Sequence, residues 1–438
     1  MRERHPLYFP IYVMCFLSIL GLLLSCTQNT QQTPTNTSGN AEIYSLHRGE
    51  ITPAQCEVFE AGSTCGVKQE IKSIIEEFLT EYHNAEAALQ SKDLTLYFAQ
   101  SNTQSYENAL MNQAALDLLI QTRQMQEQDL RMTACSATVD YLFCEEEENT
   151  LTVLLKENQE VQFACLDVTS QTNGIWHSFV FSKSGNDYEM VSHERYEDLF
   201  LLVEEEYQEQ TEDLSRTMSE IKQAMNDVTQ TLLEESKQNI SLLLQEKETY
   251  LGSPEDFDIQ RLSCDVEYNR EEAVSYAMKW WNQRNEEWME YDDLGGNCNN
   301  FISQCLYAAG IPMDYEGEST VQWKWYSDDI NLSESDWGRV PSWTGVSAFY
   351  DYCGLNEGSG LCGWVNENVF SAQPGDIIQF GAADEWRHSV IVTDRIYDEN
   401  GEVVDFLIAS NTTDRVNYPL SAYGYTSIRL LRIYGYNQ

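Results

Sequence analysis

The chain has 438 residues, of which 71 are acidic and 26 basic, giving a formal net charge of -45 and a pI near 4.2. This balance excludes nucleic-acid binding by charge, because no basic face is available to neutralise phosphates. The 42% hydrophobic content is enough for real cores and, at this length, predicts two or three domains. The acidity indicates solubility or an ion-rich setting.

Residues 1–26 have the features of an export signal, with a charged start and an apolar run from Leu7 to Leu24. The sequence "LLSC" resembles a bacterial lipobox, which implies cleavage before Cys26 and lipid attachment to its sulfur. An uncleaved membrane anchor is the alternative, because the run is long enough to span a bilayer. Residues 27–50 are polar and read as a flexible tether. We therefore expect a lipid-anchored protein on the extracellular face of a bacterial cytoplasmic membrane.

Ten of the twelve cysteines lie beyond the signal segment and its last residue. In an oxidising exterior, three short spacings favour small disulfide loops, and buried reduced thiols are the alternative. The three expected loops are Cys56–Cys65, Cys135–Cys144 and Cys353–Cys362. No CxxC spacing occurs, so a zinc ribbon or thioredoxin-like site has little support.

Residues 51–195 predict a small α+β domain. A helical pattern from Val67 to about Thr122 is followed by alternating or apolar segments between polar breaks, as in an antiparallel meander. No cysteine or serine motif accompanies His177 and His193, so both are expected to be ordinary surface or half-buried histidines.

Residues 196–256 predict a long acidic helix that ends at Gly252 and Pro254. Apolar residues recur at intervals of four and three, as in the seam of a coiled coil. They are Leu214, Met218, Ile221, Met225, Val228 and Leu232. The seam could form a homodimer, pack within the chain or belong to a stalk of about 50 Å. Packing within the chain is favoured.

Residues 257–438 contain the candidate chemistry, which begins at Cys298. Asn297 is a candidate N-cap, and helical spacing follows it, so Cys298 is predicted in the first turn of a helix. The positive end of a helix stabilises a thiolate, and its free N–H groups can bind an oxyanion. Cys305 lies deeper along the same helix and is expected to be a core thiol.

His388 is the one histidine between Cys264 and the C-terminus. It opens a predicted strand, "HSVIVT", after the turn "PGD" and the strand "IIQF". The next strand, "VVDFLIASN", ends at Asn411, whose amide could accept from the imidazole and hold its tautomer. Asp414 and, more distantly, Asp376 are rivals for that role.

The order of helix-borne cysteine, strand-borne histidine and polar residue on the next strand resembles papain-like cysteine hydrolases. More closely, "GGNCNNFISQCLYAAGIPM", "PGDIIQF", "HSVIVT" and "NTTDRVNYPLS" resemble the putative amidase domain family of bacterial exported proteins. The resemblance covers about residues 265–438 and implies an α+β, papain-like domain. It implies Cys298 as nucleophile, His388 as base and Asn411 at a position where the family often has histidine.

Two departures from the family pattern lie beside the thiol. Asn297 stands where aspartate is more usual, and Asn299 replaces a small residue. We expect Asn297, Trp386 and Asp414 to border the pocket. Most of the other tryptophans of this region are expected to pack in the core or at an interface.

These features predict a membrane-tethered cysteine amidohydrolase that forms a thioester at Cys298, with a cell-wall peptide or another amide as substrate by analogy. The alternative is a non-catalytic binding or scaffold protein with an inactive papain-like domain. No cofactor or metal is expected, because the region has one histidine and no HExxH motif.

Overall fold

The computed structural model describes residues 50–99, 102–184, 187–211, 216–258, 264–292, 296–325, 339–382 and 385–438. The expected signal segment, the lipidation site Cys26, the tether, Leu214 and Trp337 lie outside these ranges. Within them, no helix combines the length and apolar character needed to cross a membrane.

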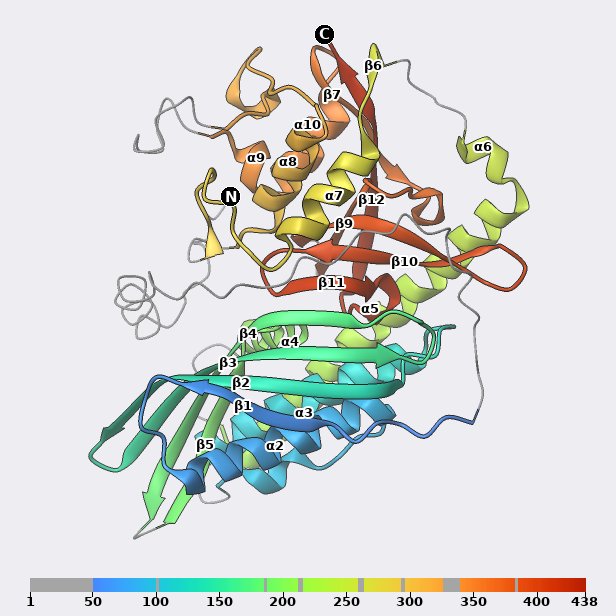
Figure 1. The fold of residues 1–438 in the computed structure, drawn as a ribbon. Helices are drawn as coiled ribbons and strands as arrows, with labels where there is room; N and C mark the ends of the chain where they lie inside the picture. The colour runs from blue at the N-terminus through green and yellow to red at the C-terminus, as the bar shows by residue number, and fades with distance from the viewer. Residues whose placement is uncertain are drawn as a thin grey trace.

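Helices and strands alternate in blocks along the chain (Figure 1). The first block comprises β1 (Glu57–Ser63), α2 (Gln69–Ala88), η1 (Leu94–Tyr97), α3 (Thr103–Gln124), β2 (Met132–Glu147), β3 (Thr150–Phe163), β4 (Ser170–Ser184) and β5 (Asp187–Arg195). Helices α4 (Asp198–Gln210), α5 (Met218–Gly252) and α6 (Pro254–Asp258) follow. The last block comprises β6 (Val266–Glu267), α7 (Arg270–Trp280), α8 (Cys298–Ala308), η3 (Ser319–Val321), α9 (Pro341–Thr344), α10 (Val346–Leu355), β7 (Gly360–Glu367), η4 (Val369–Ser371), β8 (Ile377–Ala382), β9 (Glu385–Tyr397), β10 (Val403–Ser410), β11 (Asp414–Pro419), η5 (Leu420–Ala422) and β12 (Ser427–Asn437).

The described strands form one mixed sheet of twelve, with the order β1-β2-β3-β4-β11-β10-β9-β8-β12-β6. Strand β5 pairs with β4, and β7 pairs with β12. Strands β1 and β2 are parallel, and the other pairings of the named strands are antiparallel. The mixed α/β class is therefore confirmed. The two regions that the sequence separates are joined by pairing of β4 with β11, from Asn173–Asp414 to Gln171–Val416.

Helices cover both faces of this sheet (Figure 1). Helices α2 and α3 lie on one face of β1–β4, and α7, α8 and α10 lie on one face of the C-terminal strands. Helix α5 packs on the opposite face of those strands, where Met225 and Val228 share a core with Phe380 and Val390. A second core lies between α8 and the sheet and contains Phe301, Trp343 and Ile391, among others.

The expected coiled-coil seam is buried by its own chain. Ile221, Met225, Val228 and Leu232 are at most 3% exposed, whereas Met218 at the start of α5 is 41% exposed. The expectation of packing within the chain is therefore the one that the structure bears out. The apolar face through which a homodimer was the alternative is covered, because α5 lies against α3 and the sheet.

The expected local disulfide loops are wrong. Within the described ranges, two disulfides are present, and they join Cys56 to Cys135 and Cys264 to Cys362, across 79 and 98 residues. The parallel pairing of β1 with β2 is the reason for the first, because Glu57 lies opposite Ser136 in that register. Among the described residues, the free thiols are Cys65, Cys144, Cys165, Cys298, Cys305 and Cys353.

His177 and His193 are fully buried, which corrects the expectation of surface or half-buried positions. They lie on the face of the sheet that packs against α2 and α3. Their rings are joined by a hydrogen bond of 2.9 Å between His177 Nδ1 and His193 Nε2. His193 Nδ1 lies 2.6 Å from Asn112 Oδ1, and His83 Nε2 lies 3.0 Å from Glu157 Oε2. The described residues nevertheless contain no group of three or more His, Cys, Asp or Glu side chains able to hold a metal ion.

Candidate active site

Cys298 is the first residue of α8 and is only 6% exposed. Asn297 occupies the N-cap position, but its side chain does not cap the helix. Its Oδ1 instead accepts from the backbone N–H of Tyr291 at 3.2 Å and from Asn300 Nδ2 at 2.8 Å. Gly296 precedes it with φ of 108°, a conformation that glycine adopts without strain. The turn into α8 is thus held by amide side chains.

The sulfur of Cys298 is buried as a thiol. Burial raises its pKa to about 11, although the backbone N–H groups of Ser389 and Asn299 act in the opposite direction. In this closed arrangement, burial therefore opposes the thiolate that the helix end was expected to stabilise. Activation requires a base or an opening of the site.

His388 is the fourth residue of β9 and is 4% exposed. Consecutive strand residues point to opposite faces, and Ser389 Oγ donates to Asn299 Oδ1 of α8 at 3.0 Å. His388 lies opposite Phe380 in the β8–β9 register, and the centre of its ring is 6.0 Å from that of Tyr423.

The structure therefore brings the Cys298 sulfur to the backbone N–H of Ser389, the residue next to His388. Among the described residues, no hydrogen bond joins the side chains of Cys298 and His388. His388 Nε2 is buried and has no hydrogen-bond partner.

Asp198, the first residue of α4, lies near this imidazole and was missed by the sequence analysis. Its Oδ1 accepts from the Tyr425 hydroxyl at 2.8 Å, and its Oδ2 accepts from Arg415 Nη1 at 2.9 Å. Burial lowers the pKa of His388 to about 4, and the negative charge of Asp198 opposes this shift. No sequence signal points to Asp198, because it lies 190 residues before His388 and approaches it only through the shared sheet.

Asn411 does not contact the imidazole in the described structure. Its Oδ1 accepts from Asn297 Nδ2 at 2.5 Å, and its Nδ2 donates to the carbonyls of Trp280 and Trp281 at 3.2 and 3.1 Å. Its donors and acceptor are thus used to join the end of α7 to the start of α8. The expected orienting role toward His388 has no geometric support here.

The two rival carboxylates are also used structurally. Asp414 pairs with Arg284 at 3.0 Å and accepts from the backbone N–H of Thr412 at the same distance. Asp376 is fully buried and pairs with Arg270 at 2.8 Å. Neither is hydrogen-bonded to His388.

The turn between β10 and β11 is strained beside the site. Thr412 and Thr413 have φ of 77° and 48°, which β-branched residues rarely adopt. Thr412 Oγ1 accepts from the backbone N–H of Asn297 at 2.5 Å. Such strain persists only where surrounding contacts impose it and is common at functional sites. Here the contact fixes the residue preceding Cys298.

Trp386 borders the same region. The centre of its ring lies 3.9 Å from the guanidinium carbon of Arg429. The same carbon lies 3.5 Å from the centre of the Tyr350 ring. Trp323 and Trp343 are fully buried and Trp325 is 5% exposed, as expected of core residues, whereas Trp364 is 38% exposed.

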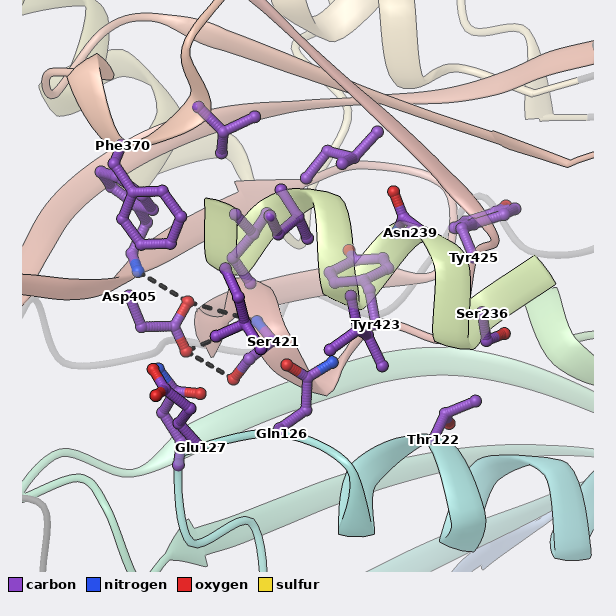
Figure 2. Close-up of a pocket in the computed structure, with 18 of the residues that line it drawn as sticks. Thr122, Gln126, Glu127, Ser236, Asn239, Phe370, Asp405, Ser421, Tyr423 and Tyr425 are labelled. Atoms are coloured by element: carbon purple, nitrogen blue, oxygen red, sulfur yellow. Dashed lines mark hydrogen bonds between the residues drawn. The ribbon is translucent and has the colours of Figure 1, made fainter. Parts of the chain in front are cut away.

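A cavity of about 60 Å³ lies on the other face of the sheet, beneath α5 (Figure 2). Phe380, Tyr423 and Tyr425 line it, and the same rings lie within 6.5 Å of the His388 ring centre. Asp405 lies at one end, where burial raises its pKa to about 6 and Ser421 Oγ donates to it at 2.5 Å. Cys298 does not line this cavity.

A smaller cavity, of about 10 Å³, lies beside α8 and has room for about one water molecule. Its lining is rich in amides, including Asn297, Asn300 and Asn411. It adjoins the residue that precedes the thiol.

Two kinds of comparison with known proteins found a similarity to this chain. The uncharacterized protein YhbB of Bacillus subtilis (strain 168) is 34% identical over 128 residues, which is 29% of this chain and 37% of that protein. The chain thus spans little more than a third of that relative's length. No solved structure matches the chain. Residues 267–434, which include Cys298, His388 and Asn411, match the family model described as "Putative amidase domain", and this match supports a hydrolase acting on C–N bonds.

Proposed function

We propose that the C-terminal region is a cysteine amidohydrolase with a papain-like site, in which Cys298 is the nucleophile and His388 the base. The observation that carries this proposal is the free thiol at the first residue of α8, with its sulfur against the N–H of Ser389, next to His388. The amidase family match over residues 267–434 supports the same chemistry.

The side chain of His388 points to the face of the sheet opposite α8, where its ring lies near those of Phe380 and Tyr423. The proposed reaction therefore needs a rearrangement of β9 that brings the imidazole to the sulfur. His388 Nε2 has no partner, so this motion breaks no hydrogen bond of that nitrogen. Catalytic hydrogen bonds are often absent in free enzymes and form in the substrate complex. The low pKa of His388, about 4, leaves it neutral and able to accept a proton at neutral pH.

The steps then follow in order. His388 takes the thiol proton as sulfur attacks the carbonyl carbon, and the N–H groups of Ser389 and Asn299 stabilise the oxyanion. The imidazolium returns its proton to the departing amine, leaving a thioester at Cys298. Water, deprotonated by His388, attacks the thioester, and the carboxylic acid leaves as the thiol is restored. The sum is amide plus water giving acid plus amine.

The substrate and location are proposed from the sequence. With the expected signal and lipobox, the site would lie outside the membrane. The proposed substrates there are amide or peptide bonds of the cell wall, by analogy with related hydrolases.

The test uses residues 27–438 and purified cell-wall fragments, with products and an acyl adduct on the Cys298 peptide measured by mass spectrometry. The parent should release new acid and amine ends, and Cys298→Ala should release none. Cys305→Ala is the matched control, because that thiol is fully buried seven residues further along α8. Equal products from the parent and the Cys298→Ala variant would contradict the proposal.

A second candidate is a non-catalytic binding protein, favoured by the burial of Cys298 and the missing hydrogen bond to His388. It predicts that wall fragments bind to the parent and to His388→Gln alike, with no product from either.

A further inference from the structure

Three side chains form a row across the face of the sheet that packs against α8 and α10. Ser389 of β9 lies opposite Gln379 of β8, and Gln379 lies opposite Arg429 of β12. Gln379 Nε2 donates to Ser389 Oγ at 3.2 Å, and Ser389 Oγ donates to Asn299 of α8. The row therefore starts beside the Cys298 thiol and ends at a guanidinium.

Arg429 is held in one orientation. Its Nε and Nη2 both donate to Gln379 Oε1, at 2.9 and 2.6 Å. The rings of Tyr350 and Trp386 lie 3.5 and 3.9 Å from its guanidinium carbon. The edge formed by Nη1 and the second N–H of Nη2 has no partner among the described residues. A planar fork fixed in this way matches the two oxygens of a carboxylate.

Among the described residues, no carboxylate lies within 4.0 Å of this cation, and the charge of Asp351 on α10 acts on it only from a greater distance. Five other arginines of the C-terminal half lie within 4.0 Å of carboxylates, namely Arg270, Arg284, Arg387, Arg415 and Arg432. No such pair is found for Arg339 or Arg395 among the described residues, and Arg395 donates to the carbonyls of Ser371 and Ala372 instead. Arg429 has no such pair in the described part of the chain and is 9% exposed. Burial lowers its pKa to about 10, which means that its charge is poorly solvated where it lies. An anion arriving at its free edge would relieve that cost.

We propose that Arg429, between Trp386 and Tyr350, binds a carboxylate of the substrate that Cys298 attacks. This inference rests on the proposed function. Neighbouring strands lie about 4.8 Å apart, so the backbones of Ser389 and Arg429 are roughly 10 Å apart. An extended peptide covers that distance in about three residues. The substrate class is therefore a peptide with a carboxylate about three residues from the scissile carbonyl.

The test measures binding without turnover. Residues 27–438 with Cys298→Ala are immobilised and offered a library of randomised tetrapeptides, as free acids and as C-terminal amides, with retained peptides counted by mass spectrometry. Free acids should be retained about tenfold more than amides, as expected of one charge-assisted hydrogen-bonded pair. Because the chain is strongly acidic, its overall field works against this preference.

Arg429→Gln in the same background should remove the preference, and Arg429→Lys should keep part of it. Arg131→Gln is the control for loss of one positive charge, since Arg131 pairs with Asp129 far along the chain from α8. If the Cys298→Ala protein with Arg429 intact retained free acids and amides equally, the proposal would be overturned. Stronger competition by inorganic phosphate than by acetate would overturn it too.

The outcome is separable from that of the proposed function. Selective retention of acids with no turnover by the Cys298 protein would leave the carboxylate site standing and remove the amidohydrolase. Turnover without a preference for acids would support the amidohydrolase and remove the carboxylate site.

Discussion

Two groups of buried imidazoles differ in how their nitrogens are satisfied. In the N-terminal half, His83 lies between Glu86 and Glu157, and His193 lies between His177 and Asn112. In the C-terminal half, His388 is as well buried, but its Nε2 has no partner.

Buried polar groups without partners are costly and uncommon, so each needs an explanation. The bonded imidazoles of the first group stabilise the fold, and the unpartnered nitrogen of His388 agrees with the role of base proposed for it. His177 fits the first group despite its unpaired Nε2, which lies 3.6 Å from the Glu157 carboxylate.

The largest expected effect separates activity from stability at His388. His388→Gln should lower turnover at least about 10²-fold, because the proposed base is lost. Its free energy of unfolding should change by less than about 1 kcal/mol, since Nε2 makes no hydrogen bond to lose. Turnover of cell-wall fragments and urea unfolding measure the two quantities. A loss of activity that only follows a loss of folded protein would break the comparison.

Glu157 should show the opposite behaviour. Glu157→Gln should lower the free energy of unfolding by about 3 to 5 kcal/mol, because the buried charges of His83 and Arg195 lose their shared counter-ion. Labelling of Cys298 in the folded fraction should not change. Glu160→Gln is the control, since Glu160 is exposed on the same strand. Equal unfolding curves for the two variants would mean that the network contributes little.

The sequence predicted local features of the site better than contacts between distant segments. The helix that starts at Cys298 and the strands around His388 follow from periodicity and turn residues, and both were found. The approach of Asp198 and the disulfide between Cys56 and Cys135 depend on strand pairing across the chain. No local pattern encodes that pairing.

Burial was the other quantity that the sequence could not supply. The predicted helix start at Cys298 correctly suggested N–H groups near the sulfur. The pKa of the Cys298 thiol, however, also depends on how deeply the surrounding protein buries the sulfur. The same applies to Asn411, a residue correctly placed after β10 whose amide is used by Asn297 and the end of α7.

The pH dependence of stability should differ between His83 and His388. Burial opposes charge on His83, but the ion pair with Glu157 outweighs it and raises its pKa to about 9. Its stabilisation is thus full below the unfolded pKa of about 6.5 and is lost as the pH rises through 9. For His388, with a pKa near 4, the unfolded chain binds the proton first, so stability falls as the pH drops from about 6.5 to 4.

Urea unfolding across pH tests both signs. His83→Gln should flatten the alkaline loss, and His388→Gln should remove part of the acid loss, with His177 contributing the same sign of effect through its own pKa of about 3. An alkaline loss unchanged in His83→Gln would show that its ion pair is not the cause.

The smallest expected effect concerns backbone strain beside the C-terminal site. Thr413 has φ of 48°, in the left-handed region, where a β-branched side chain is disfavoured and asparagine is tolerated. Its backbone carbonyl accepts from Ser410 Oγ, and this contact survives a change of side chain. Thr413→Asn should therefore raise the free energy of unfolding by about 1 kcal/mol in urea. Thr412→Asn is the matched comparison, because its φ is also positive but its hydroxyl accepts from Asn297. That variant should gain no stability and should slow turnover, whereas equal gains at both positions would mean that the Thr412 contact does not position the residue before the thiol.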